Sequence, residues 1–266
     1  MAQVIALEKS SGGRLGVFAL DVSTGSTIAH RADERFPMCS TFKFLAVAAV
    51  LKRVDGGLDR LDRRIGYTKA ELLDYAPITR KNVAAGAMSV GALCAAAIEY
   101  SDNTAANLLV ASLGGPSAVT AFARSLGDRI TRLDRTEPAL NSGIPGDPRD
   151  TTSPRAMAAD MRAILTGPVL SSASRAKLTG WMVDCKTGLT CLRAGLPHSW
   201  RVADKTGSGG PVNAAGASDT RNDIATAWRP NGRPAIVAAY LTGSQLTSTG
   251  SDAVLAGVGR LVAARL

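Results

Sequence analysis

The sequence predicts a two-lobed α+β fold, in which an antiparallel sheet of about five strands is flanked by helices and carries an inserted all-α lobe. Strand patterns occur only near the two ends of the chain, whereas the middle, from Ser40 to about Asp184, is mostly helical. The 266 residues are 45% hydrophobic, which is enough for a large core. We expect residues 1–35 and 185–266 to form the α/β lobe, and residues 36–184, including the loop 135–150, to form the all-α lobe. Active sites often lie in the groove between such lobes.

The N-terminal segment supplies one helix and two strands. Residues 3–11 predict a short helix, which ends at Gly12-Gly13. Residues 14–30 predict a hairpin, because apolar residues alternate loosely on both sides of a turn at residues 23–26.

The C-terminal segment supplies the remaining strands and a closing helix. Strand patterns occur at Arg201–Lys205, Ile224–Trp228 and Ile236–Thr242, and apolar residues at helical spacing predict a helix over Ser251–Ala264. Within the helical segment, residues 142–154 hold three prolines, two glycines and several charges, and therefore predict a long loop.

The charge balance and the apolar runs exclude several functional classes. The net charge of +9 at first suggests a polyanionic partner, but the basic residues are spread along the chain and interleaved with acidic ones. Only 5% of residues are aromatic, so nucleic-acid binding is not predicted. The longest apolar run, Phe44–Leu51, is far short of the roughly 20 residues of a membrane span.

The cysteines and histidines predict neither a metal site nor another cofactor. The four cysteines lack metal-ligand spacing, and the two histidines are far apart in the sequence. Cys185 and Cys191 are close enough in sequence to form a disulfide, but the spacing alone does not establish one. The chain begins without a charged and apolar leader, so either it is cytoplasmic or its export signal was replaced by a starting Met.

The helix that begins near Ser40 carries the first chemical signal. Phe42–Leu51 is apolar nearly all round, yet it contains Lys43, whose buried ammonium needs partners or a lowered pKa. Ser40 lies one turn before Lys43 on the same face, at a helix N-terminus that favours developing negative charge. A hydroxyl beside a perturbed amine is typical of an activated nucleophile.

Each short motif is weak by itself, because the same chain contains second copies. Ser174 and Lys177 repeat the Ser-x-x-Lys spacing, and Lys186-Thr187-Gly188 repeats Lys205-Thr206-Gly207. We interpret these second copies as a surface helix and a surface turn. The combination of motifs in one order therefore carries the functional prediction.

Four motifs follow one another along the chain: Ser40-Thr41-Phe42-Lys43, Ser101-Asp102-Asn103, Glu137-Pro138-Ala139-Leu140-Asn141 and Lys205-Thr206-Gly207. In these motifs, and in runs that flank them over essentially the whole length, the chain resembles the class A serine β-lactamases. The resemblance implies hydrolysis of penicillins and cephalosporins, which gives antibiotic resistance.

The resemblance implies a role for each acylating group. Ser40 attacks the lactam carbonyl to form an acyl-enzyme, and the backbone N–H groups of Ser40 and Ser208 stabilise the oxyanion. Ser101 and Lys43 carry a proton to the leaving nitrogen. Whether Lys43 or Glu137 is the base for acylation is disputed in the family, and the sequence leaves both open.

The resemblance also implies how the acyl-enzyme is hydrolysed. Glu137 and Asn141 hold the hydrolytic water, and Asn103 holds the acylamino side chain of the substrate. Arg135 and Asp150 form an ion pair that closes the loop between them. Breaking a buried pair of this kind from one side costs roughly 3–5 kcal/mol.

The remaining implied contacts concern the substrate carboxylate and the mouth of the cleft. Lys205, Thr206 and Arg221 face the carboxylate, and Ser208 after Lys-Thr-Gly is compatible with cephalosporins. The alternative carboxylate-binding arginine of some relatives is missing here, because residues 250–252 read Gly-Ser-Asp. Tyr75 resembles the aromatic gate of the family.

The chain departs from the family pattern in two places. Residues 211–218 extend the hairpin after Lys-Thr-Gly, and this insertion either alters access for bulky cephalosporins or is a tolerated surface insertion. Cys39 lacks the partner that carbapenem-hydrolysing relatives carry, because Gly209 stands at that position. We therefore expect Cys39 to be a buried free thiol. Cys94 also lacks its usual partner, since that position is Val47.

Two rival functions remain open. A penicillin-binding DD-peptidase shares Ser-x-x-Lys and Lys-Thr-Gly, and a non-hydrolysing β-lactam sensor acylates and stops. The pair Glu137 and Asn141 argues against both. The family further implies a monomer that is periplasmic or secreted and needs no cofactor, with a small-molecule β-lactam as its partner.

Overall fold

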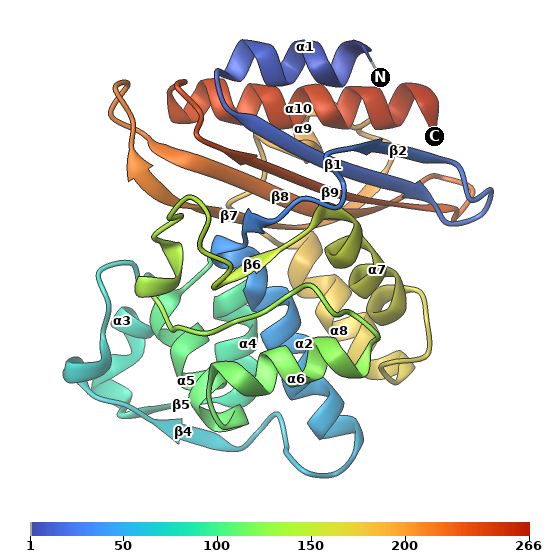
Figure 1. Ribbon diagram of the computed structural model, residues 1–266. Coiled ribbons are helices and arrows are strands. Elements are labelled where there is room, and N and C mark those ends of the chain that lie inside the picture. Colours follow the sequence, from blue (N-terminus) through green and yellow to red (C-terminus); the bar gives the residue numbers. More distant parts are fainter. Residues whose placement is uncertain (1) are drawn as a thin grey trace.

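The computed structural model describes residues 2–266, and its centre is one five-stranded antiparallel sheet (Figure 1). Met1, which begins the first predicted lobe segment, lies outside the described residues. The strand order is β2-β1-β9-β8-β7. The strands are β1 Arg14–Asp21, β2 Thr27–His30, β7 Arg201–Val212, β8 Ser218–Trp228 and β9 Pro234–Thr242. The predicted five-stranded antiparallel sheet, built from both ends of the chain, is therefore confirmed.

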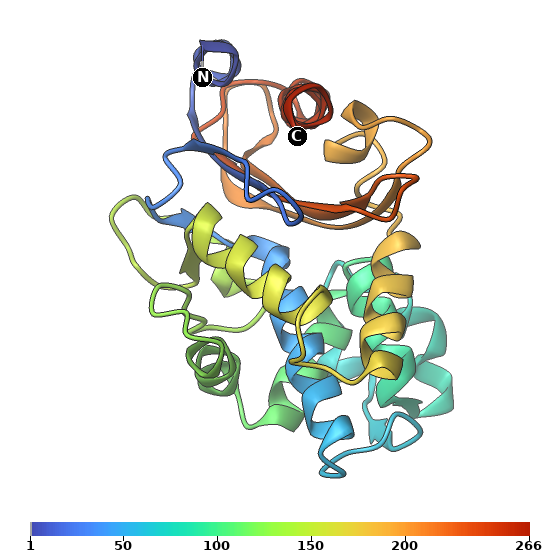
Figure 2. The same cartoon turned by 90° about the vertical axis from the view of Figure 1, so that its right-hand side faces the viewer.

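One face of the sheet is covered by the terminal helices. α1 (Ala2–Ser11) and α10 (Ser248–Arg265) lie side by side on it, with the short α9 (Leu192–Gly195) beside α10 (Figures 1 and 2). The close approach of α9 and α10 requires a glycine, because a Cβ on Gly259 would lie 2.4 Å from the backbone oxygen of Leu192. Apolar side chains of the sheet and of α10 form one buried cluster here.

The other face of the sheet rests on the helical lobe. Its central helix, α2 (Phe42–Asp55), is buried at every position from Phe42 to Leu51, as the apolar pattern predicts. Four helices pack on α2: α4 Val90–Glu99, α5 Asn103–Leu113, α6 Pro116–Ser125 and α8 Ser172–Val183. The lobe also contains α3 (Thr79–Asn82) and α7 (Pro154–Leu165). Within residues 2–266, no single helix is long and apolar enough to cross a membrane, and only α5 with α6, bent by 71°, meets the length and composition together.

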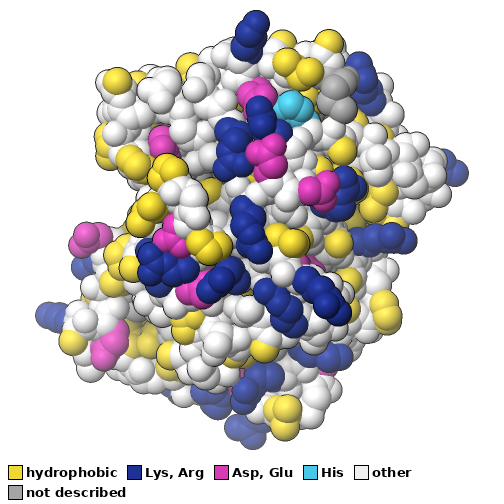
Figure 3. Space-filling view, viewed as in Figure 1, with side chains coloured by type: hydrophobic (Ala, Val, Ile, Leu, Met, Phe, Trp, Pro, Cys, Tyr) yellow, Lys and Arg dark blue, Asp and Glu magenta, His cyan; other side chains and the backbone are white. Residues whose placement is uncertain are grey.

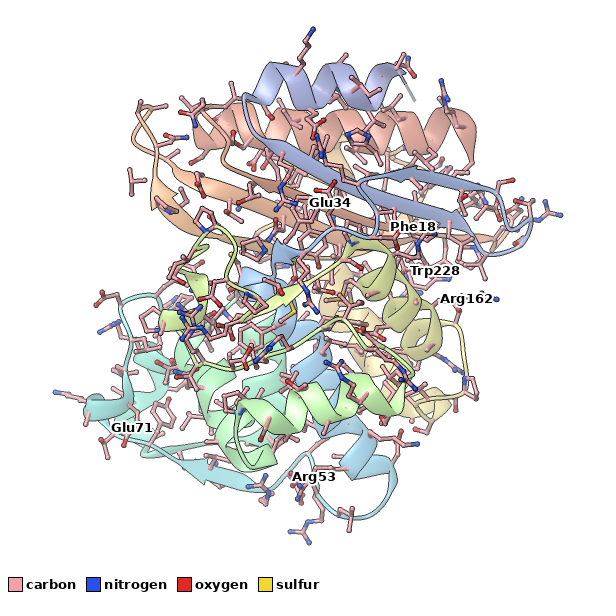
Figure 4. The ribbon with its side chains drawn as sticks, in the orientation of Figure 1. Phe18, Glu34, Arg53, Glu71, Arg162 and Trp228 are labelled. Carbon is pink, nitrogen blue, oxygen red and sulfur yellow. The ribbon has the colours of Figure 1, made fainter. Side chains whose placement is uncertain are left out.

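α7 packs against β1 and β9 on the face of the sheet that meets the helical lobe. Phe18 on β1 and Arg162 on α7 line the same depression there (Figure 4). Phe18 is only 7% exposed, and the guanidinium of Arg155 stacks on its ring at 4.6 Å. This contact joins the two lobes on the side away from the nucleophile.

Four short strands escape the sequence pattern. β3 (Phe36–Pro37) pairs with β6 (Thr151–Thr152), and β4 (Arg64–Gly66) pairs with β5 (Ala87–Ser89). Strands of two or three residues are too short to show a recognisable alternation. The β3–β6 pair matters for the site, because it joins the segment before Ser40 to the end of the loop 135–150.

The hairpin of β7 and β8 is longer than the strand patterns alone predict, and it extends into residues 211–218 as the departure from the family pattern implies. β7 continues past Lys205 to Val212, and β8 begins at Ser218 rather than at Ile224. The extra ladder is rich in glycine and polar residues, and its register shifts between Gly209 and Val212. Backbone pairing needs no apolar pattern, so hydrophobic periodicity alone misses these residues.

Basic side chains are dispersed over both lobes in the face that Figure 3 shows, and several have acidic neighbours. Arg14 pairs with Glu34 at 2.8 Å, and Arg132 pairs with Asp134 at 2.6 Å. Interleaving of this kind agrees with the charge pattern of the sequence.

Candidate active site

The candidate nucleophile Ser40 lies in a tight turn, Cys39–Thr41, directly before α2. The turn is held against the sheet, because Asn222 Nδ2 donates to Pro37 O at 2.9 Å and to Met38 O at 3.2 Å. A Cβ on Gly207 would lie 2.7 Å from Met38 O and 3.2 Å from Ser40 N. The glycine of Lys-Thr-Gly therefore allows β7 to approach the nucleophile's backbone.

Lys43 is fully buried and contacts several oxygens of the site. Its Nζ lies 2.8 Å from Ser40 Oγ, 2.7 Å from Ser101 O, 2.6 Å from Asn103 Oδ1 and 3.1 Å from Glu137 Oε1. Burial lowers the pKa of Lys43, and the carboxylate of Glu137 partly offsets this effect. The sequence predicts that a lysine in this apolar helix needs partners, and these oxygens are the partners of Lys43.

Glu137 faces Ser40 from the loop 135–150. Ser40 Oγ donates to Glu137 Oε1 at 3.2 Å, and Asn141 Nδ2 donates to Glu137 Oε2 at 2.5 Å. Asn107 on α5 fixes the backbone of Glu137, because its side chain both accepts from Glu137 N and donates to Glu137 O, each at 2.9 Å. The carboxylate is thus held from the loop and from α5.

Ser101 links Lys43 to Lys205 across the groove. Its Oγ is 3.3 Å from Lys43 Nζ and 2.9 Å from Lys205 Nζ. Burial lowers the pKa of Lys205 to about 8, and the positive charge of Lys43 acts in the same direction. Ser101 itself has φ 58°, a strained value for a residue that is not glycine.

The loop around Ser101 is braced by a fully buried carboxylate. Asp102 accepts from the backbone N–H groups of Ile78 and Thr79, each at 2.9 Å. It also caps α5, because Ala105 N donates to it at 2.9 Å. These bonds fix Asp102, and they thereby fix the backbone next to its chain neighbours Ser101 and Asn103.

The side chains surround a cleft of about 270 Å³ between the sheet and the helical lobe. Larger depressions, of about 380 to 730 Å³, lie elsewhere and do not include Ser40. The cleft is lined by Ser40, Tyr75, Ser101, Asn103, Asn141, Thr187, Thr206, Gly207, Ser208 and Arg221. Lys43, Glu137 and Lys205 lie directly behind this lining, where their side chains have no exposure.

The rim contains Tyr75 and Arg221. Tyr75 is 51% exposed, and its carbonyl accepts from Asn103 N at 3.0 Å. Arg221 is held by Asp252, since its Nε donates to Asp252 Oδ1 at 2.6 Å. The sequence shows only that residues 250–252 lack an arginine, whereas in the structure this segment contributes the acidic partner of Arg221.

Arg135 and Asp150 lie at the base of the loop and away from the cleft lining. Arg135 Nε donates to Asp150 Oδ2 at 2.6 Å, and Asp150 is fully buried. The insertion 211–218 also lies outside the lining. Asn213 ties its turn to the segment before α10, because Nδ2 donates to Ser244 O at 2.7 Å and to Leu246 O at 2.8 Å.

All four cysteines lie within the described residues, and all four are buried free thiols. The expectation for Cys39 is confirmed, and the question of a bridge between Cys185 and Cys191 is answered, since neither is in a disulfide. Burial raises the pKa of each of these thiols.

Two residues of the site were missed by sequence reasoning. Thr187, in the second Lys-Thr-Gly copy, was interpreted as part of a surface turn. That interpretation is wrong, because Thr187 lines the cleft and its hydroxyl lies 2.6 Å from Thr206 Oγ1. The repeated motif was a signal, but only the fold shows that both copies face one groove.

Asn107 gave no signal except its position four residues after Asn103. The other second copy does lie on a helix, α8, where Lys177 is exposed.

Comparisons with known proteins cover the whole chain. A model of the "Beta-lactamase enzyme family" matches residues 1–266. Beta-lactamase CTX-M-97 of Escherichia coli is 49% identical over 260 residues, which are 98% of this chain and 87% of that protein. Beta-lactamase L2 of Stenotrophomonas maltophilia is 51% identical over 257 residues, 96% of this chain and 82% of that protein. The solved structure of an ancestral class A beta-lactamase has a TM-score of 0.94 and 58% identity, and covers 100% of this chain and 99% of that one.

Proposed function

The chain belongs to the class A β-lactamases and hydrolyses the amide bond of β-lactams, and we propose that it does so through an acyl-enzyme on Ser40. One arrangement carries the proposal: Ser40 Oγ contacts Lys43 Nζ at 2.8 Å and Glu137 Oε1 at 3.2 Å. A hydroxyl held between an amine and a carboxylate has a base within reach.

Acylation begins when Ser40 Oγ attacks the lactam carbonyl carbon and a new C–O bond forms. The hydroxyl proton has two acceptors in contact, Lys43 in its neutral form and Glu137. The lowered pKa of Lys43 increases the fraction of neutral amine. Ser40 and Ser208 both line the cleft. Their backbone N–H groups are the donors that stabilise the oxyanion of the tetrahedral intermediate.

Ring opening breaks the C–N bond, and the leaving nitrogen needs a proton. Ser101 supplies it and is reprotonated from Lys43, whose Nζ lies 3.3 Å from Ser101 Oγ. Lys205, at 2.9 Å from the same oxygen, stabilises the transient negative charge on Ser101. The product of this stage is an ester between Ser40 and the opened substrate.

Deacylation uses the pair Glu137 and Asn141. Their side chains hold a water, Glu137 takes one of its protons, and the water oxygen attacks the ester carbonyl. The C–O bond to Ser40 then breaks, and Glu137 returns the proton to Ser40 Oγ, from which its Oε1 lies 3.2 Å away. Asn107 supports this step by fixing the backbone of Glu137 on both sides.

Substrate binding uses the rim and the β7 side of the cleft. The substrate carboxylate lies near Thr206 and Arg221, and the buried Lys205 attracts it from behind. Asn103 Oδ1 is engaged by Lys43, so its amide N–H group points to the acylamino side chain of the substrate. Tyr75, at the mouth, packs against that side chain.

Penicillins and cephalosporins are the substrates we propose, with antibiotic resistance as the consequence. The DD-peptidase and sensor alternatives lack the pair Glu137 and Asn141, and the relatives with 49–51% identity are named β-lactamases. A chromogenic cephalosporin tests the choice. We expect many turnovers per molecule of protein, whereas a single stoichiometric burst would contradict hydrolysis. Ser40→Ala is the control that abolishes both.

We also propose that the protein is a monomer that acts in the periplasm or after secretion, and that the two lobes divide near residues 36 and 184. Family membership supports the location. Cell fractionation and size-exclusion chromatography test the first two statements, and limited proteolysis tests the third.

A further inference from the structure

Two buried carboxyl groups meet on the side of the helical lobe that does not face the cleft. Asp128 lies in the segment after α6, and Asp160 lies on α7. They are 8% and 1% exposed, and their side chains are within hydrogen-bond reach of each other. Neither residue belongs to the reaction proposed above.

The hydrogen bonds of the pair leave one proton to be accounted for. Asp128 Oδ1 accepts from Ile130 N at 2.6 Å and from Thr131 N at 3.0 Å. The Oδ2 atoms of Asp128 and Asp160 are both buried and have no hydrogen-bond donor within residues 2–266. Two carboxylates cannot donate to each other, but a carboxylic acid can donate to a carboxylate. One proton held between the side chains therefore supplies the missing donor.

The surroundings do not neutralise a second negative charge. The positive charge of Arg124 on α6 acts on Asp160, but its Nη1 donates to the carbonyl of Asp128 at 2.6 Å. Tyr240 on β9 directs its hydroxyl to Thr41 Oγ1 at 3.2 Å. The charged side chains at the rim of the adjoining depression are Asp33, Arg129 and Arg155. Arg155 is engaged by Asp33 at 2.8 Å.

Burial raises the pKa of the Asp160 carboxyl to about 9, and the charge of Asp128 acts in the same direction. The two backbone donors lie on Asp128, so the proton of the pair resides on Asp160.

We propose that Asp160 is a carboxylic acid at neutral pH and donates a hydrogen bond to the Asp128 carboxylate, which forms a proton-dependent latch between α7 and the segment that leads to Glu137. The latched segment is continuous with the site. Thr131 Oγ1 lies 2.6 Å from Thr152 Oγ1, and Arg132 N donates to Thr151 O at 3.0 Å. Removing the proton places two negative charges together at the start of this segment.

The dependence of stability on pH tests the latch. Asp160 is protonated in the folded protein but ionised in the unfolded chain above about pH 4, so unfolding releases a proton. This residue therefore destabilises the fold progressively as the pH rises towards about 9, and its effect is constant above that pH. Asp160→Asn keeps a donor for Asp128 and removes the titrating proton. From chemical denaturation, we expect the unfolding equilibrium constant of the wild type, divided by that of the variant, to rise about tenfold per pH unit between about pH 5 and pH 8.

Asp33→Asn is the matched control, because Asp33 lies at the rim of the same depression with its side chain 74% exposed. Its ratio to wild type should change little over the same pH range. A constant ratio for Asp160→Asn would overturn the proposal. Carbon-13 NMR of the aspartate carboxyl groups in the wild type gives an independent answer even if the variant does not fold. The Asp160 signal should titrate above pH 7, and titration below pH 5 would overturn the latch.

Discussion

Arg135 and Asp150 join the two ends of the loop that carries Glu137, with Nε and Oδ2 only 2.6 Å apart. Asp150 is fully buried, and its other oxygen accepts from the backbone N–H groups of Asp134 at 2.8 Å and of Arg135 at 2.9 Å. One carboxylate therefore holds the loop closed through both a side chain and the backbone. The ion pair acts at the base of the loop, whereas Asn107 fixes the loop near Glu137.

Removing this carboxylate should loosen the loop without removing any group that touches the nucleophile. We expect Asp150→Ala to lower the free energy of unfolding by about 3–5 kcal/mol, because Arg135 and two backbone donors lose their partner. Deacylation should slow more than acylation, since Glu137 and Asn141 lie on the loop whereas Ser40 and Lys43 do not. Stopped-flow burst kinetics measures the two rates separately.

Asp147→Ala is the control for this prediction, because Asp147 pairs with Arg149 within the same loop at 2.6 Å but near solvent. It should leave both rates and the stability close to those of the wild type. An unchanged deacylation rate in Asp150→Ala would refute the role of the ion pair.

The alkaline limit of activity should report Lys205. Its pKa of about 8 means that the ammonium loses its charge as the pH rises through that value. Attraction for the substrate carboxylate and stabilisation of Ser101 then fall, so kcat/KM should decline above about pH 8. Lys205→Arg keeps the charge, and its kcat/KM profile should extend to higher pH even if the maximum is lower. The same alkaline limit in both proteins would assign it to another group.

The insertion 211–218 should affect stability more than specificity. No residue of this segment lines the cleft, and Asn213 ties its turn to Ser244 and Leu246. Deleting 211–218 should therefore leave the ratio of kcat/KM between penicillins and bulky cephalosporins unchanged. A ratio that shifts in favour of one class would show that the hairpin controls access. Asn213→Ala separates the two effects, because it removes the tie and keeps the chain length.

The sequence predicts the fold where apolar residues form a continuous run or a periodic pattern. The central helix from Phe42 and the strands near Ile224 and Ile236 are of this kind, and all of them are buried. Apolar periodicity misses strands that form only through backbone pairing with a distant segment. Examples are the extension of β7 to Val212 and the two-residue strand Phe36–Pro37. These segments have no alternation of their own, and their partners are distant in the chain.

The site follows the same division. Motif order identified Ser40, Lys43 and Glu137, which the structure brings within hydrogen-bond distance of one another. Thr187 and the pairing of Arg221 with Asp252 could not be foreseen, because each depends on the place where a turn or helix end meets the cleft. A motif identifies the reactive side chain, but the contacts of that side chain depend on the tertiary structure.

The most direct test of the proposed mechanism is mass spectrometry of Glu137→Ala after mixing with a penicillin. We expect a stable adduct on Ser40 with the mass of the intact penicillin, because the nucleophile remains but the base for the hydrolytic water is gone. Ser40→Ala should form no adduct. Rapid turnover of penicillin by Glu137→Ala, with no adduct observed, would contradict the central claim.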